Sequence, residues 1–368
     1  MTSARPLKIA HFDTGLRLRG GQRQLLQLAR RLRQRGHCQI IVCQEESELE
    51  RRARAEEFSR FALPLHDPKH AYGILQFRQH LRDAPCDILH AHDGQGQTVA
   101  WLASIGMPVR RVANRGVTFL PTPRWTHRLK YTHTCDAIVA ASDSIRQLLI
   151  RSEVPESKIE LIPDGIEIPP ELPSMAARTE ARAHWGFGED EFLAGHLGAF
   201  TPEKGQDIAL EAFRLLIKRL PKARLLLAGE GPTLRTPAIT RLLDELGDAV
   251  GLCGEIENLA EFFPALDLFV MPSKSEGLGS SAIMAMSYGL PVVACRVGGL
   301  PEIVEEARTG WLVEPASPSA LAEAIMSAAG NPARLKQFGL NGRERARQFS
   351  FDIKVDRTEA LYRRLLFG

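Results

Sequence analysis

Hydrophobic and polar positions along the chain alternate between short apolar runs and amphipathic stretches. Residues 7–13 read LKIAHFD, which is typical of a buried strand. Residues 20–35 then carry apolar side chains at helical spacing, and Gly36 ends that stretch. The same succession recurs up to residue 162 and again in the second half of the chain. Repeated strand–helix units predict parallel sheets covered by helices, with ligands at the carboxyl ends of the strands.

The apolar runs give the expected order of strands. In the first half we expect strands at residues 7–13, 38–43, 61–65, 87–91, 109–113, 137–141 and 158–162. In the second half we expect strands at residues 192–198, 223–229, 249–254, 267–273, 291–295 and 311–315. Ser142 and Ser317 are expected to cap two of the intervening helices, and residues 351–367 are expected to form a last helix.

A stretch rich in proline divides the chain in two. Residues 163–173 read PDGIEIPPELP, and 368 residues are too many for one ordinary core. We therefore expect a first domain at residues 1–165, a second at residues 175–350, and a terminal helix at residues 351–368. Both domains are expected to be doubly wound, Rossmann-like α/β domains that face a cleft.

Charge is unevenly distributed, although the net charge is only +3. Residues 17–35 contain seven arginines, and no acidic residue lies between Thr14 and Gln44. Such a basic face suits anionic lipid headgroups or a phosphorylated acceptor, whereas a solvated helix face is the plain alternative. The segment lacks interleaved aromatic residues, so no nucleic-acid partner is expected.

The cysteines and the chain start indicate the compartment. Six scattered cysteines without a CxxC pair predict reduced, buried thiols and neither a disulfide framework nor a zinc site. No apolar run approaches the roughly 20 residues that span a membrane, and the first strand leaves no room for a signal peptide. We expect a cytoplasmic protein that attaches peripherally to the inner face of a membrane through residues 17–35.

Residues 273–302 carry the chemistry that organises the second half. Glu276 enters a loop with Gly277 and Gly279, and Ser280 follows at a helix start. Backbone N–H groups at such a start bind anions, and a carboxylate beside them can accept hydrogen bonds from hydroxyl groups. The loop therefore indicates a sugar attached to phosphate. A strand-to-helix turn that needs glycine for tight packing is the alternative.

The motifs taken together resemble those of glycosyltransferase family 4, whose members are retaining enzymes with the GT-B fold. The resemblance covers nearly the whole chain in the family's order, and it implies that the terminal helix at residues 351–368 crosses back to pack on the first domain. It rests on the Gly20-Gly21 loop, DILHAHD at 87–93, VPESKIELIPDGIE at 154–167, GAFTPEKGQDIALEAF at 198–213, LLLAGEGP at 225–232, DLFVMPSKSEGLGSS at 267–281 and GLPVVACRVGGLPEIV at 289–304. Each motif alone is weak, and together they are specific.

The resemblance assigns roles to single residues at a donor site. Lys204 is implied to pair with the diphosphate of a nucleotide sugar, and Glu276 is implied to hold the sugar hydroxyls; these two are the catalytic candidates. Gly20 and Gly21 are implied to let the backbone approach the donor. The turn that contains Ile256 is implied to hold the nucleotide base through backbone contacts. The remaining donor-side candidates are at the helix start: Gly277, Leu278, Gly279 and Ser280.

Three departures from the family pattern stand out. The family's second carboxylate, which usually binds the ribose, is replaced by Met284, and the arginine partner of the lysine is replaced by Ala199. We expect Arg296 to supply a second cation for the diphosphate. A histidine common in the first domain is replaced by Asn114 and Arg115. Arg115 is therefore one acceptor-side candidate. His92 is the other, because it ends a predicted strand at the edge of the sheet where ligands bind, and a structural role is the alternative for it.

The resemblance implies a retaining hexosyltransferase that needs no metal and no cofactor other than its donor substrate. The expected donor is a UDP-sugar before a GDP-sugar, and the expected acceptor is a cell-envelope glycan, such as lipopolysaccharide, or a lipid-linked glycan. Met284 and Ala199 leave open a degenerate protein that binds without turnover, and a sugar-nucleotide epimerase is a further alternative. Neither GGQRQL at residues 20–25 nor GEGPTL at residues 229–234 has the GxGxxG spacing of a dinucleotide site, so an oxidoreductase is not expected.

Overall fold

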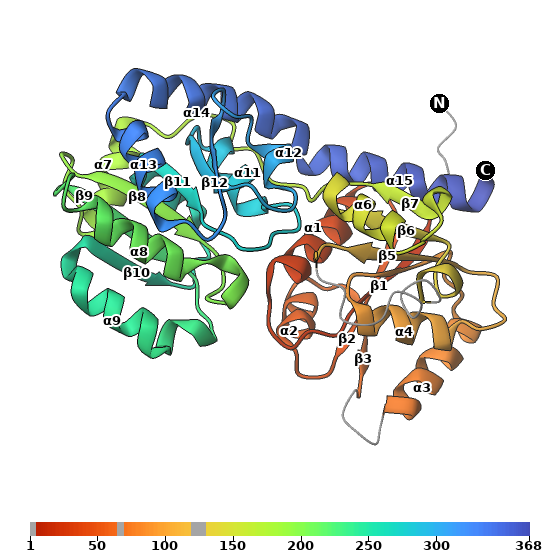
Figure 1. The fold of residues 1–368 in the computed structure, drawn as a ribbon. Coiled ribbons are helices and arrows are strands. Elements are labelled where there is room, and N and C mark those ends of the chain that lie inside the picture. Colours follow the sequence, from red (N-terminus) through yellow and green to blue (C-terminus); the bar gives the residue numbers. More distant parts are fainter. Residues whose placement is uncertain (1–4, 65–69, 119–129) are drawn as a thin grey trace. The chain divides into compact units, whose positions relative to one another are not determined.

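The computed structural model describes residues 5–64, 70–118 and 130–368, and it forms two compact units (Figure 1). Unit 1 comprises Met1–Gly165 and Phe351–Gly368, and unit 2 comprises Ile166–Ser350. Each unit contains one parallel β-sheet with helices packed against it. The predicted α/β fold class is confirmed in both units.

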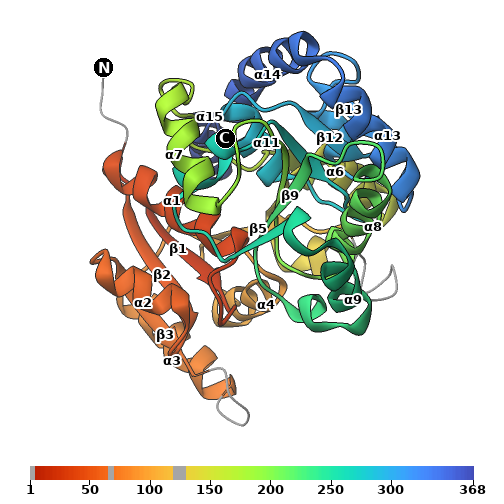
Figure 2. The ribbon, with the colours of Figure 1, turned by 90° about the vertical axis from the view of Figure 1, so that its left-hand side faces the viewer.

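Unit 1 contains a seven-stranded parallel sheet in the order β3-β2-β1-β4-β5-β6-β7, and Figure 2 shows its first three strands side by side. The strands are β1 Lys8–Asp13, β2 Cys38–Gln44, β3 Ser59–Leu63, β4 Ile88–Ala91, β5 Arg110–Arg115, β6 Ala137–Ala140 and β7 Ile159–Leu161. The helices are α1 Gly20–Gln34, α2 Glu48–Ala55, α3 His70–Asp83, α4 Gly94–Ala103, α6 Asp143–Arg151 and α15 Phe351–Phe367.

Unit 2 contains a six-stranded parallel sheet in the order β10-β9-β8-β11-β12-β13. The strands are β8 Phe192–Leu197, β9 Ala223–Ala228, β10 Val250–Gly254, β11 Leu268–Met271, β12 Val292–Cys295 and β13 Gly310–Val313. The helices are α7 Met175–Trp185, α8 Gln206–Leu216, α9 Pro237–Leu246, α10 Leu259–Phe262, α11 Ser280–Ser287, α12 Leu300–Ile303, α13 Pro318–Ala329 and α14 Pro332–Ala346.

The last helix of the chain belongs to the core of unit 1. Val355, Leu361 and Tyr362 of α15 are buried in one cluster with Leu7 and Ile9 at the start of the chain. The arginine-rich end of α1 pairs with the acidic residues of α15, which adds polar contacts at the rim of this cluster. A segment that follows unit 2 in sequence therefore completes the hydrophobic core of unit 1.

Within residues 5–64, 70–118 and 130–368, the sequence pattern located every strand but missed three helices. α2, α7 and α14 were not predicted. Ser142 and Ser317 cap α6 and α13 as predicted. The strand expected at residues 61–65 is β3, although residue 65 itself lies outside the described residues.

The six cysteines are free thiols, as expected from their spacing. Cys43, Cys86, Cys135 and Cys295 are buried. The expectation of burial is wrong for Cys38, which is exposed at the first position of β2, and Cys253 is only partly buried.

Candidate functional site

The sheet order of unit 2 brings the loops that carry Lys204 and Glu276 to the same edge of the sheet. β8 and β11 are neighbours, and the chain leaves β8 toward β9 on one side and reaches β12 on the other side of β11. This is the topological switch point, where doubly wound sheets bind ligands at the carboxyl ends of their strands. The loop after β8 carries Lys204, and the loop after β11 carries Glu276.

Lys204 and Glu276 form an ion pair across this switch point. Nζ of Lys204 lies 2.7 Å from Oε2 of Glu276, and the side chains are 25% and 11% exposed. The hydroxyl of Ser273 lies 3.4 Å from the same carboxylate oxygen. An ammonium group has three N–H donors, so this bond leaves Lys204 able to donate to an anion as well. The structure thus brings together both catalytic candidates, which are 72 residues apart in the sequence.

Backbone contacts fix the two loops against each other. The N–H group of Lys274 donates to the carbonyl of Glu203 at 2.8 Å. Gly205 has φ +70°, and a Cβ at this position would lie 2.1 Å from the carbonyl oxygen of Pro272. Because only glycine fits this approach, the residue after Lys204 sets the distance between the loops.

The second glycine pair of the 273–302 stretch supports the backbone of Glu276. Gly298 has φ +54°, and a Cβ there would lie 1.7 Å from the carbonyl oxygen of Glu276. The N–H group of Gly299 donates to this same oxygen at 3.3 Å. The turn before α12 therefore holds the main chain of Glu276 in place, which the sequence alone did not indicate.

A buried polar pair behind the Lys204 loop was also missed by the sequence analysis. His196 of β8 is fully buried, and its Nδ1 lies 2.9 Å from the carbonyl oxygen of Val270. Nε2 of Gln206 lies 3.3 Å from Nε2 of His196 and donates to the carbonyl of Ala199 at 2.9 Å. Burial lowers the pKa of His196 to about 4, so the ring is neutral and can accept from Gln206. These contacts anchor the segment that carries Lys204.

The start of α11 lies directly after Glu276. Gly277, Leu278 and Gly279 are buried, and Ser280 is the first residue of the helix. Gly279 occupies the N-cap position with φ +97°, and no side chain caps the helix. Backbone N–H groups at such a helix start are suitable donors to a phosphate group.

Two donor-side candidates lie outside these contacts. The guanidinium group of Arg296 lies 3.3 Å from Glu306, and both side chains are about half exposed. Ile256 lies in the loop between β10 and α10 and is partly buried. Among the described residues, neither side chain has a hydrogen bond or ion pair with Lys204 or Glu276, so the expectation that Arg296 adds a second cation gains no support.

His92 belongs to a network of buried and partly buried polar side chains in unit 1. Its Nε2 lies 3.0 Å from Nδ1 of His11, and its Nδ1 lies 2.9 Å from Nδ2 of Asn114. Oδ1 of Asn114 lies 2.7 Å from Nε2 of His90. At the two ends, Tyr362 of α15 lies 2.5 Å from Nδ1 of His90, and Gln39 lies 2.8 Å from Nε2 of His11.

The Asn114 amide determines the direction of the hydrogen bonds in this network. Its NH₂ group donates to His92, so the other nitrogen of His92 carries the proton and donates to His11. Its carbonyl accepts from His90, whose second nitrogen therefore accepts from the hydroxyl of Tyr362. All three imidazoles are then neutral. This agrees with burial, which lowers the pKa of His11 to about 4, of His90 to about 3 and of His92 well below 6.5.

The three histidines were tested as a metal site. One ligand atom from each lies within 4.8 Å of the others. All six ring nitrogens already donate or accept within the network, so no lone pair is directed at a common point. The same contacts occupy both nitrogens of His92. The donor set therefore fits a hydrogen-bond network better than a metal ion, and the structural alternative for His92 accounts for its contacts.

Gly20 and Gly21 are the first two residues of α1, and both are exposed. A Cβ at either position would meet no atom within 4 Å, so packing does not explain these glycines. Arg115 ends β5, and its guanidinium donates to the hydroxyl of Tyr131 at 3.3 Å. The structure therefore places Gly20, Gly21, His92 and Arg115 in unit 1 and the other site candidates in unit 2.

The arginines in the second half of residues 17–35 are held within unit 1. Arg30 pairs with Glu56, and the guanidinium of Arg33 lies 4.1 Å from the ring centre of Phe58. Arg31 and Arg35 pair with acidic residues of α15 at 2.6–3.1 Å. These contacts engage four of the seven arginines that were expected to face an anionic membrane, and three of the four are paired with carboxylates. The structure therefore gives that expectation no support for this part of the segment.

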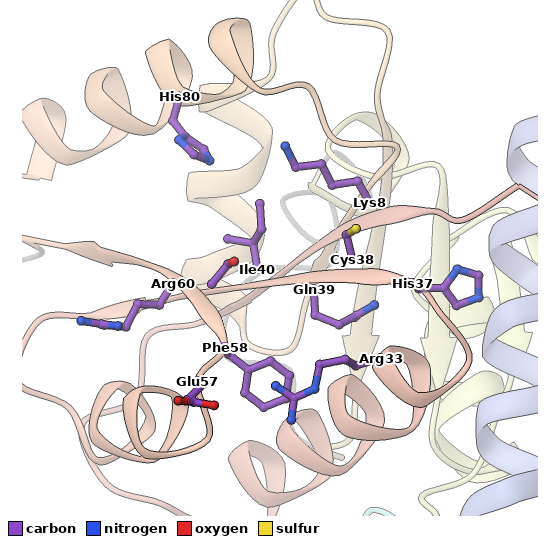
Figure 3. A pocket seen from close by; sticks show the side chains of 11 residues that line it. Lys8, Arg33, His37, Cys38, Gln39, Ile40, Glu57, Phe58, Arg60 and His80 are labelled. Carbon is purple, nitrogen blue, oxygen red and sulfur yellow. The ribbon is translucent and has the colours of Figure 1, made fainter.

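A hollow of about 500 Å³ lies at the amino ends of β1, β2 and β3. Figure 3 shows Lys8, Ile40 and His80 on one side of β2 and Gln39 and Phe58 on the other. The hollow thus surrounds the end of a strand, at the edge of the sheet opposite to the carboxyl ends. Its position does not suit the ligand site of a doubly wound sheet.

Two family models match the two halves of the chain. Residues 18–168 match the model "Glycosyltransferase Family 4", and residues 177–345 match the model "Glycosyl transferases group 1". A D-inositol 3-phosphate glycosyltransferase of Mycobacterium leprae is 30% identical over 337 residues, which cover 84% of this chain and 77% of the relative. A GDP-mannose-dependent alpha-(1-6)-phosphatidylinositol monomannoside mannosyltransferase of Mycolicibacterium smegmatis is 31% identical over 239 residues, 62% of each chain.

Solved structures of similar fold cover almost the whole chain. HepE of Anabaena, solved in complex with UDP and glucose, superposes with a TM-score of 0.85 at 19% identity over 96% of this chain and 99% of its own. WaaG, a glycosyltransferase involved in lipopolysaccharide biosynthesis, gives a TM-score of 0.74 at 17% identity over 98% of this chain and 100% of its own.

Proposed function

Because the chain belongs to glycosyltransferase family 4 and has the GT-B fold, we propose that it transfers a hexose with retention of configuration. The proposed donor is a nucleotide diphosphate sugar, and the proposed acceptor is a cell-envelope or lipid-linked glycan. The observation that carries the proposal is the contact between Lys204 and Glu276 at the switch point of unit 2. This contact places an ammonium group, which can bind phosphate, beside a carboxylate, which can accept hydrogen bonds from sugar hydroxyls.

The donor is proposed to bind across this pair. The ammonium group of Lys204 and the N–H groups at the start of α11 would donate to the diphosphate, whose charge grows as the glycosidic bond breaks. The carboxylate of Glu276 has a second oxygen, Oε1, that can accept from sugar hydroxyls. In this account Lys204 and the helix start neutralise the diphosphate without a metal ion.

The transfer step is proposed to need no protein nucleophile. The bond between the anomeric carbon and the diphosphate oxygen breaks, and the acceptor oxygen bonds to the same face of that carbon. The acceptor proton passes to an oxygen of the departing nucleoside diphosphate. Glu276 is paired with Lys204, so the structure favours a role in holding the donor over attack on the anomeric carbon.

Relatives and neighbours suggest which donors to test. HepE was solved with UDP, which supports a UDP-sugar as the first choice. The mannosyltransferase relative is GDP-mannose-dependent, so a GDP-sugar is the second choice. The phosphatidylinositol monomannoside and the lipopolysaccharide in two of these proteins' names support a lipid-linked or envelope acceptor. D-inositol 3-phosphate, in the name of the other relative, is a small phosphorylated polyol and does not support that acceptor class.

The membrane association remains part of the proposal. Among the described residues, no helix has both the length and the apolar character required to span a bilayer. We propose that the enzyme works at the cytoplasmic face of the membrane, where a lipid-linked acceptor would present its glycan.

The test is nucleotide release from UDP- and GDP-sugars in the presence of envelope lipid and glycan extracts. We expect one donor to be consumed only with acceptor, and we expect the product to keep the anomeric configuration of the donor by NMR. If no sugar nucleotide is turned over and none binds by calorimetry, the proposal is wrong.

A protein that binds a sugar nucleotide without turnover is the second candidate, because Met284 is partly buried in α11 where the family has a carboxylate. Two lost ribose hydrogen bonds would cost about 2–3 kcal/mol of donor affinity. Donor binding without transfer or hydrolysis would favour this candidate. Epimerisation of the donor without any acceptor would instead favour the epimerase alternative.

A further inference from the structure

Two buried side chains clamp the segment that joins β1 to α1. Oδ1 of Asp13 accepts from Nε2 of Gln22 at 2.7 Å and from the backbone N–H of Gly15 at 2.9 Å. Oε1 of Gln22 accepts from the backbone N–H of Arg19 at 2.9 Å. Asp13 is 2% exposed and Gln22 is 9% exposed. The carboxylate and the amide thus hold both ends of residues 14–19.

Close packing shows that the clamp is tight. A Cβ on Gly15 would lie 2.4 Å from Nε2 of Gln22 and 3.1 Å from Oδ1 of Asp13, so a side chain there would open the clamp. The neighbouring Thr14 donates its hydroxyl and its N–H group to Asp93, which also caps α4. The segment therefore has a defined conformation up to the start of α1.

The clamp ends where the predicted donor contact begins. Gln22 is the third residue of α1 and directly follows Gly20 and Gly21. Within the described part of the chain, a Cβ at either glycine would have no atom within 4 Å, so other side chains do not cover them. Arg19 occupies the N-cap position, and its guanidinium has no acceptor for the first N–H groups of the helix. The clamp therefore orients two glycines without covering them.

We propose that Asp13 and Gln22 are positioning residues for sugar transfer, which hold Gly20 and Gly21 in the orientation that lets their backbone approach the donor. This inference rests on the proposed function. It adds residues for which the family motifs gave no role, because Asp13 ends a strand and Gln22 lies inside a helix.

The charges around Asp13 give the clamp a measurable property. Burial and the nearby carboxylate of Asp93 raise the pKa of Asp13 to about 6, and the hydrogen bonds from Gly15 and Gln22 oppose this rise. Cys43 of β2 is paired with Asp13 in the sheet, and burial, with the carboxylates of Glu50 and Asp13 as smaller causes, raises the pKa of its thiol to about 12. Among the described residues, no cation is placed to stabilise the Asp13 carboxylate.

Gln22→Glu converts this property into a test. At about pH 8 two carboxylates would face each other with no proton between them, so the clamp would open. At about pH 5.5 the pair would hold one proton, and the protonated Glu would donate as the Gln amide does. Gln34→Glu makes the same substitution at the exposed end of α1 and is the matched control.

We expect kcat/KM for the donor to fall roughly 10- to 100-fold in Gln22→Glu at about pH 8 and to recover to within about threefold of wild type at about pH 5.5. Gln34→Glu should follow the wild type at both pH values. Amide exchange of Arg19 should quicken in Gln22→Glu at the higher pH only, which reports the clamp independently of activity.

The outcomes separate the two claims. A wild type without transfer contradicts the proposed function. A wild type that transfers sugar, with Gln22→Glu matching Gln34→Glu at both pH values, contradicts the positioning role. Loss of activity in Gln22→Glu that does not recover at lower pH also contradicts it, because the clamp would then not be the cause.

Discussion

At the scale of single residues, the ion pair between Lys204 and Glu276 is the feature on which the proposed donor site depends. Lys204 reaches Glu276 at 2.7 Å, and both side chains remain partly accessible. The sequence placed each residue in a motif, but their separation of 72 positions gave no indication that the two side chains touch. Only the sheet order, which sets β8 beside β11, brings them together.

Removal of the Lys204 charge should affect transfer more than stability. We expect Lys204→Met to lower kcat about 10²- to 10³-fold, because a cation at the departing diphosphate is lost. The unfolding temperature should change little, since the pair is partly exposed. Lys274→Met is the control, because Lys274 is exposed and pairs with Asp207. Equal losses of kcat in both variants would contradict the role given to Lys204.

The buried histidines of unit 1 should make the protein sensitive to acid. Their pKa values in the folded chain lie near 4 for His11, near 3 for His90 and well below 6.5 for His92, whereas the unfolded chain titrates near 6.5. Between about pH 6.5 and 4 the unfolded state therefore binds more protons, so stability falls as pH falls. Asp13, whose pKa is raised to about 6, is one group with the opposite effect, because the folded state binds its proton at a higher pH than the unfolded state does.

Thermal unfolding measured from about pH 7 to pH 5 checks this expectation. We expect the unfolding temperature to fall across this window. His90→Gln should flatten the dependence, whereas His133→Gln, at an exposed position, should leave it unchanged. NMR would show directly whether the three imidazoles stay neutral at pH 6, and titration of all three near pH 6.5 would contradict the network.

At the scale of elements, apolar periodicity predicted the strands well and polar helices poorly. α2 and α7 read ELERRARA and MAARTEARAHW, which lack a broad apolar stripe. Their caps, Ser47 and Ser174, were the available signal. α14 contains two glycines, of which Gly339 lies so close to the carbonyl of Gly289 that a Cβ would stand 1.9 Å from its oxygen. Tertiary packing, which the sequence pattern does not contain, explains that helix.

The turn before α12 should be necessary for the donor site. Gly298→Ala would force a Cβ against the carbonyl of Glu276, so we expect both the unfolding temperature and the donor affinity to fall. Gly330→Ala, at the end of α13 where a Cβ finds ordinary contacts, is the control. Calorimetry of donor binding would show the loss, and unchanged affinity in Gly298→Ala would contradict the support given to Glu276.

The hydroxyl of Tyr362 joins α15 to the sheet of unit 1. Tyr362→Phe would leave Nδ1 of His90 buried without a donor, so we expect a loss of about 1–3 kcal/mol in the free energy of unfolding. Tyr72→Phe, at an exposed position of α3, should have no effect. Chemical denaturation of both variants measures the difference, and equal stability would show that the bond to His90 contributes nothing.

At the scale of the whole molecule, two doubly wound units divide the candidate residues between them. The fold class followed from the repeated strand–helix pattern, and the family followed from the order of the motifs. The histidine network was only partly predictable. His90 lies on β4 and His92 directly follows that strand, two positions along the chain, but His11 and Tyr362 join them from distant parts of the chain. Such contacts depend on the pairing of β1 with β4 and on the return of α15.

We propose that the paired Lys204 and Glu276 form the donor site of a retaining glycosyltransferase. The direct measurement is transfer from the preferred sugar nucleotide, with product configuration read by NMR, in wild type, Lys204→Met and Glu276→Gln. We expect retention in the wild type and a loss of at least about 100-fold in kcat/KM in each variant. Inversion of configuration, or wild-type activity in both variants, would contradict it.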